Sequence, residues 1–244
     1  MVEVTPSRVL EAAARAAAPD GVDPAALQKL LIWLSPAFPV GSYAYSHGLE
    51  WAIEDGSVTT PDALREWLAA ILEHGAGRID AIMLAHAWRA HGPELRGIAE
   101  LAAAFQPSRE RHLEATAQGA ALLSAVASSW PSEALAAAIA ETTGIAVTYP
   151  VAIAIAAAAH GIPLTATLTA YLTAFVANIV SAGVRAIPIG QSAGQRVIAT
   201  LTPLVATTAA AAEAASLDEL GGAALRADIA SMKHETQYTR LFRS

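Results

Sequence analysis

Apolar residues recur along this sequence mostly at helical spacing, and no stretch sustains the two-residue alternation of a half-buried strand. Near the start, leucines spaced at i, i+3, i+4 and i+7 predict a helix over residues 24–34 with one apolar face. These are Leu27, Leu30, Leu31 and Leu34. Two prolines and a glycine interrupt the pattern over residues 35–42, and a second helix is predicted over residues 45–55.

Helix-start signals place the remaining helices. Thr60 supplies a capping hydroxyl and Pro61 suits the first helical position, so a helix begins there and ends near Gly75. Ser216 and Glu219 form a capping-box pattern before a last helix that runs towards residue 232. Further helices are predicted over residues 78–90, 93–105, 108–128, 132–141, 150–160, 164–184 and 193–215.

This series of helices predicts an all-α fold. Roughly ten helices with short connections are typical of a single-domain bundle, which we place over residues 25–232. Residues 1–24 are predicted to be a flexible, Ala-rich N-terminal extension, because a turn-rich spacer separates them from the first leucine-rich helix. Residues 233–244 form a separate tail that contains neither Gly nor Pro.

Composition narrows the classes of function. The net charge of −7 provides no basic field for nucleic acid. With no cysteine in the sequence, disulfides, thiolate catalysis and cysteine-based metal centres are excluded, which fits a reducing cytoplasm. Hydrophobic residues make up 54% of the chain and charged residues 15%, an apolar balance that indicates surface buried against other macromolecules.

One uncharged stretch raises the possibility of a membrane span. No Asp, Glu, Lys or Arg lies between Glu141 and Arg185, and residues 164–184 are long enough to cross a bilayer. The threonines, Asn178 and Ser181 in that stretch lower its hydrophobicity below that of a typical span. We therefore expect helices buried on nearly all sides in a bundle or at a subunit interface, and an integral membrane component is the alternative.

Sequence motifs for catalysis are weak. No phosphate-binding loop pattern occurs, so a nucleotide hydrolase is not expected. Residues 190–194 match the G-x-S-x-G nucleophile elbow around Ser192, but that motif requires a strand before the serine, and none is predicted. A serine hydrolase is thus the competing enzyme hypothesis, against a simple elbow between two helices.

Histidines and acids suggest no metal site. His47 and Glu50 are three residues apart on a predicted helix, and Glu50 and Glu54 are four apart. Isolated His/Glu pairs of this kind are mostly ordinary polar groups, and no metalloprotease motif accompanies them. We predict no resident metal and no cofactor.

The tail and two polar clusters are the candidate binding residues. Tyr, Phe and Arg are over-represented where one protein anchors in another, so the tail either contacts a partner or folds onto its own domain. Polar groups within apolar surroundings likewise need a partner, internal or external. The candidates are Tyr43, Ser46 and Glu50; Arg185, Gln191, Gln195 and Arg196; and Lys233, His234, Glu235, Tyr238, Arg240, Leu241, Phe242 and Arg243.

Three segments together resemble the urease accessory protein UreF family. They are SPAFPVGSYAYSHGLE over residues 35–50, NIVSAGVRAIPIGQSAGQR over residues 178–196 and MKHETQYTRLFRS over residues 232–244. The resemblance covers about residues 27–244 and is weakest between Ala90 and Glu141. The sequence departs from the family at Ser42, where a second glycine is frequent, and at Tyr149, where a histidine is frequent.

The resemblance implies an all-α protein that is not itself an enzyme. Such a protein pairs with UreD (UreH in some organisms) and recruits the GTPase UreG to apo-urease. Nickel delivery and lysine carbamylation are then coupled to GTP use, and the protein forms a dimer within that assembly. Nickel would be handled by the complex, with direct binding left open.

The same resemblance sets expectations for the candidate residues. We expect residues 234–244 to become ordered on contact with partners, with Tyr238, Arg240, Leu241 and Phe242 as anchors. We also expect the cluster around Arg185 to face either a partner or a polar path for the ion.

Overall fold

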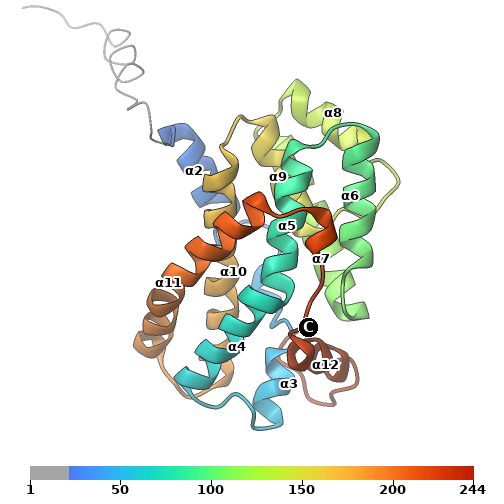
Figure 1. Cartoon of the computed structure of the whole chain (residues 1–244). Coiled ribbons are helices and arrows are strands. Elements are labelled where there is room, and N and C mark those ends of the chain that lie inside the picture. The colour runs from blue at the N-terminus through green and yellow to red at the C-terminus, as the bar shows by residue number, and fades with distance from the viewer. Residues whose placement is uncertain (1–21) are drawn as a thin grey trace, which may run out of the picture.

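Helix α10 (Leu164–Ala186) forms the centre of the structure, and α2, α3, α4, α5, α9 and α11 all contact it. The computed structural model describes residues 22–244, and within this range every regular element is helical (Figure 1). The predicted all-α bundle is therefore confirmed. The predicted extension over residues 1–24 lies outside the described residues except at its end, where Pro24 already begins a helix.

The helices follow the order expected from the sequence. They are α2 (Pro24–Trp33), α3 (Leu49–Glu54), α4 (Pro61–His74), α5 (Ala76–Arg89), α6 (Pro93–Ala104), α7 (Arg109–Ser129), α8 (Glu133–Glu141), α9 (Tyr149–Ala159), α10, α11 (Gln191–Ala214) and α12 (Leu225–His234), with short 3-10 helices η1 (Ser42–Ala44) and η2 (Leu217–Glu219). Helices α3 and α12 lie together at one end of the bundle (Figure 1).

Helix caps explain why several boundaries were predictable. The Thr60 hydroxyl accepts a hydrogen bond from the Ala63 backbone N–H at 3.2 Å, as its place before a proline predicts. Ser108 caps α7 in the same way. The capping box at Ser216 is present, but it begins the short helix η2 rather than the last helix, which starts only at Leu225.

The apolar stretch around α9 is the most buried part of the core. Val151, Ile153 and Ala154 are fully buried, because α5, α7, α8 and α10 surround this helix. Alanine at alternate positions allows these helices to approach closely without losing helix propensity. The absence of charge in this part of the sequence therefore reflects burial inside the bundle.

Two described helices, α10 and α11, are long and apolar enough to cross a membrane by length and composition alone. In the most apolar window of α10, 56% of the residues are buried inside the protein, and the figure for α11 is 33%. Burial of α10 on nearly all sides within the bundle, one of the two expectations from the sequence, is therefore wrong, and burial at a subunit interface stays a prediction. Thr165, Thr169 and Thr173 form an exposed stripe, and their hydroxyls bond to carbonyls within the helix or to Glu213.

Two further predictions near the start of the chain differ from the structure. The predicted helix over residues 45–55 begins only at Leu49, because His47 and Gly48 both have left-handed backbone angles. In α2 the buried stripe consists of Ala26, Leu30 and Trp33, whereas Leu27 and Leu31 are exposed. One edge of α2 therefore packs on the bundle, and part of its leucine face stays uncovered.

Candidate partner-binding site at the folded tail

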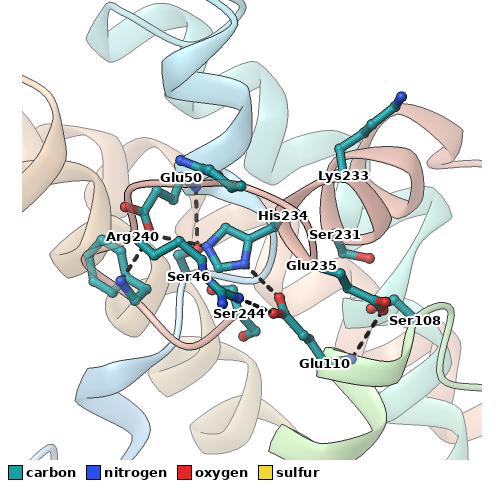
Figure 2. Close-up of polar contacts among 12 residues, drawn as sticks. Ser46, Glu50, Ser108, Glu110, Ser231, Lys233, His234, Glu235, Arg240 and Ser244 are labelled. Atoms are coloured by element: carbon teal, nitrogen blue, oxygen red, sulfur yellow. Dashed lines mark hydrogen bonds and ion pairs between the residues drawn. The ribbon is translucent and has the colours of Figure 1, made fainter.

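The tail folds back onto its own domain. After α12, residues 235–244 return alongside α3 and η1 (Figure 2). The Arg243 N–H donates to the Ala44 carbonyl at 2.8 Å, and the Ser46 N–H donates to the Ser244 carbonyl at 2.6 Å. Of the two interpretations of the tail, the structure thus shows the internal one.

Glu50 is the main acceptor for the tail. Its carboxylate is 7% exposed and accepts the backbone N–H groups of Leu241 at 2.6 Å and Phe242 at 2.9 Å. It is placed there because Gly48 lets α12 approach closely: a β-carbon at Gly48 would lie 2.7 Å from the Ser231 backbone nitrogen. The first turn of α3 is therefore built to receive the tail.

His234, at the end of α12, is fully buried between two acids (Figure 2). Its Nε2 lies 3.1 Å from Glu50 Oε2, and its Nδ1 lies 2.6 Å from Glu110 Oε2 on α7. Arg240 donates to the other oxygen of Glu110 at 2.7 Å. Glu235 accepts the Arg109 N–H at 2.8 Å and so caps the start of α7. These contacts connect α3, α7, α12 and the tail.

A second buried network lies below the tail. Glu114 accepts hydrogen bonds from Ser244 Oγ at 2.6 Å and Gln118 Nε2 at 3.2 Å, and it pairs with Arg111 and His47. Burial alone would raise the pKa of Glu114, but Arg111, His47 and Ser244 together outweigh it and lower the pKa to about 2. Glu114 is thus a carboxylate held ionised inside the protein.

The network continues to Asp80, whose carboxylate accepts the Tyr171 hydroxyl at 2.9 Å. Burial raises the pKa of Asp80 to about 6, although Arg111 and Tyr171 oppose the shift. The pKa of His47 is lowered, mainly because the ring is buried and secondly because the positive charge of Arg111 is close. These groups border a cavity of about 90 Å³ that Tyr149 and Asn178 also line. The departure from the family at Tyr149 therefore faces this cavity.

Arg185 joins the second sequence cluster to the tail. Its guanidinium carbon lies 4.0 Å from the ring centre of Tyr43 and 4.5 Å from that of Phe242, and its NH2 group donates to the Tyr43 carbonyl at 2.9 Å. Segment 35–50, segment 178–196 and the tail over residues 233–244, all singled out in the sequence, therefore meet at this point.

The fifteen candidate residues fall into three groups. Buried within the chain are Ser46, Glu50, His234 and Phe242, so in this conformation the Phe242 ring, expected to anchor a partner, instead fills its own domain. Close to the tail and accessible are Tyr43, Arg185, Lys233, Glu235, Tyr238, Arg240, Leu241 and Arg243. Exposed on the first turns of α11 are Gln191, Gln195 and Arg196, and no hydrogen bond among the described residues joins them to the tail.

Other contributors were not anticipated. Glu110, Arg111 and Glu114 on α7 hold the tail and the buried network, but the resemblance is weakest in that region. The sequence does indicate that this region is unusual, because four charged residues fall within residues 109–114 of a chain that is only 15% charged. His47 and Glu50 do not share a helix face, and within residues 22–244 no group of three His or acidic residues could hold a metal ion.

Ser192 lies exposed in the first turn of α11, directly after the connection from α10. Residues 22–244 contain no strand before it, so the geometry that activates a nucleophile elbow is not formed in this part of the chain. The helix-to-helix elbow is the interpretation that fits.

The fold and site together define an all-α protein whose C-terminal tail is hydrogen-bonded to buried polar groups of its own domain. The family model described as UreF matches residues 58–202, and the chain belongs to the UreF family of urease accessory proteins.

Relatives match over most of their length. The chain is 55% identical over 224 residues to the urease accessory protein UreF of Rhodopseudomonas palustris (strain BisB5), covering 90% of this chain and 92% of that protein. Identity is 53% over 222 residues with the UreF of Methylobacterium sp. (strain 4-46), covering 88% and 87%. It is 51% over 228 residues with the UreF of Bradyrhizobium sp. (strain ORS 278), covering 92% and 94%. The resemblance is thus confirmed, and with it a role as a urease accessory protein.

Proposed function

We propose that the protein is a non-enzymatic scaffold in the maturation of urease. It links a UreD/UreH-type protein and a UreG-type GTPase to the urease apoprotein, so that nickel insertion is coupled to GTP use. Nickel is the cargo of the complex, and the protein itself carries no resident cofactor. It acts in the cytoplasm as a chaperone for metallocentre assembly, without nucleic acid or membrane partners.

The observation that supports this proposal is the surface formed by the outer side of the tail. Leu241 is 73% exposed and Tyr238 is fully exposed, and the buried carboxylate of Glu50 fixes the backbone at Leu241 and Phe242. Tyr43 is exposed on the adjoining helix η1 and stacks against Arg185. Aromatic, leucine and arginine side chains on an ordered backbone form a contact surface with little entropy left to lose on binding.

Helix α12 offers a second uncovered surface, which we assign to a homodimer within the complex. Leu225, Ile229 and Met232 lie one helical turn apart on one face and are each at least half exposed. A cavity of about 270 Å³ lined by Trp67 and Leu225 adjoins this face. A two-fold dimer brings the same patch of each subunit together, which an apolar stripe of this kind can satisfy.

The tail surface is tested by point substitutions on its exposed side. Deleting residues 235–244 would also remove the two backbone donors to Glu50 and the Ser244 donor to Glu114, so a loss of binding could not be told from a loss of folding. Tyr238→Ala with Leu241→Ala removes only exposed side chains. After co-expression with the accessory partners and urease, the tagged double variant should lose co-purification of the partners while its circular dichroism and melting temperature stay unchanged.

Leu113→Ala is the matched control, because it truncates a leucine that is similarly exposed on α7. Full partner recovery by the double variant, or an equal loss with Leu113→Ala, would contradict the assignment of the tail surface. The dimer is tested separately by light scattering of the complex with Ile229→Glu, which should halve the mass of the assembly because the two-fold contact is lost. An unchanged mass would contradict the assignment of α12.

A further inference from the structure

Both ring nitrogens of His234 face carboxylate oxygens, at 2.6 Å on the Glu110 side and 3.1 Å on the Glu50 side (Figure 2). A neutral imidazole has one N–H donor and one lone pair, so it can donate to only one of these acids. The other nitrogen would place its lone pair against an oxygen lone pair in a fully buried site. The arrangement therefore needs one additional proton.

The contacts of the two acids indicate where that proton resides. Glu50 accepts two backbone N–H groups from the tail, and Glu110 accepts the guanidinium of Arg240. These donors bind a carboxylate more strongly than a protonated acid, because hydrogen bonds to an ionised acceptor are the stronger ones. The proton is best placed on His234, whose imidazolium donates to both acids.

We propose that the imidazolium of His234 is a proton-dependent clip that holds the tail closed over α3 and α7. Without that proton the ring can donate to only one of the two acids, so the other acid loses its hydrogen bond from His234 and the tail loosens. The clip is a property of the isolated chain and stands apart from the partner assignments.

The other charged groups around the clip keep their partners when it opens or closes. From α3, Glu54 accepts a hydrogen bond from Gln237, and from α12, Glu235 caps α7. Arg240, from the tail, stays paired with Glu110, and Lys233 points away from the cluster (Figure 2). Among the described groups packed here, the proton on His234 is thus the one whose loss removes a hydrogen bond to a buried acid.

The test uses NMR of the isotopically labelled full chain, followed as the pH is raised until the ring loses its proton. The ¹⁵N shifts of His234 report its protonation, and the exchange protection of the Leu241 and Phe242 amides reports tail closure. We expect both ring nitrogens protonated at the acid end. Protection should fall about tenfold to a hundredfold as the proton leaves, the size expected for losing one hydrogen bond to a charged group.

Three substitutions distinguish the effect of the His234 proton on tail closure from a change in overall folding stability. His234→Gln should give low protection without a pH step, whereas His91→Gln, at an exposed histidine, should keep the wild-type step. Glu110→Gln provides a donor for the lone pair of a neutral ring, so it should keep the tail closed and remove the step, even if His234→Gln folds poorly. A singly protonated His234 throughout with constant protection, or a wild-type step in Glu110→Gln, would overturn the proposal.

Discussion

The guanidinium of Arg185 lies over the ring of Phe242, with 4.5 Å between the guanidinium carbon and the ring centre. This contact fastens the tail to α10, because Phe242 is buried on its other side. The same guanidinium covers Tyr43, so one exposed side chain holds two aromatic rings from separate segments. Arg185 therefore stabilises the tail from outside, while Glu50 and His234 hold it from inside.

Replacing Arg185 with alanine should loosen the tail with little effect on the rest of the fold. A cation–π contact at an exposed site contributes about 0.5–1 kcal/mol, so losing the one to Phe242 should lower the exchange protection of Phe242 by roughly two- to fivefold. Urease activation in a reconstituted assay should drop further than the melting temperature does. Arg185→Lys keeps the charge and loses the planar group, so its exchange protection and activation should lie between those of the wild type and Arg185→Ala. Equal losses of stability and activation would instead mark Arg185 as purely structural.

Gly119→Ala should be strongly destabilising. A β-carbon at this position of α7 would lie 2.1 Å from the Val147 carbonyl oxygen, so the α7–α9 contact must open. Overpacking of this kind costs about 1–3 kcal/mol or more, measurable by urea denaturation. Gly97→Ala is the matched control, because this exposed glycine of α6 has nothing within 4 Å of the added carbon. Gly97→Ala should raise the free energy of unfolding by up to about 1 kcal/mol, because alanine has the higher helix propensity. A stabilising Gly119→Ala or a strongly destabilising Gly97→Ala would contradict the prediction.

Asp80 should make stability fall as the pH rises through about 6. Its pKa is raised to about 6 in the fold by burial, against about 3.9 for an unfolded aspartate. The folded state therefore binds the proton more tightly, and this contribution is complete below about pH 4 and lost above about pH 6. The difference corresponds to roughly 3 kcal/mol at most.

Asp80→Asn cannot ionise, so it should flatten the unfolding free energy between pH 4 and pH 7, followed by urea denaturation. Asp62→Asn alters an exposed carboxylate and should retain the wild-type slope. If the slopes of wild type and Asp80→Asn agreed, the assigned protonation of Asp80 would be wrong.

Glu114 should act in the opposite direction at low pH. Its pKa of about 2 in the fold lies below about 4.3 for an unfolded glutamate, so its stabilisation is present above that value and lost as the pH falls towards 2. At pH 7, Glu114→Gln leaves Arg111 buried beside a neutral amide, which should cost about 3–5 kcal/mol in chemical denaturation.

Glu66→Gln provides the comparison, since Glu66 pairs with Arg65 at the surface. Exposed ion pairs contribute about 0–1 kcal/mol, so this substitution should hardly change the free energy of unfolding. A comparable loss in both variants would show that the buried network adds no special stability.

Much of the helical architecture could be predicted from local patterns. The start of α4 at Thr60 and Pro61 and the start of α7 at Ser108 follow from hydroxyl caps that act within one turn. The start of α3 could not, because the left-handed angles of His47 and Gly48 depend on α12 packing against them. Likewise, periodicity alone did not show which edge of α2 is buried, since its leucines and its Ala26–Leu30–Trp33 stripe are both apolar.

By itself, the sequence determined the helical class, the order of the helices and, through three short segments, the family. These depend on caps, periodicity and composition, which act over a few residues. Only the tertiary structure decided that the tail lies in its own domain and that Glu110 and Glu114, far from it in the chain, receive it. Those pairings join residues more than a hundred positions apart, and which buried acid meets which donor depends on how the helices pack.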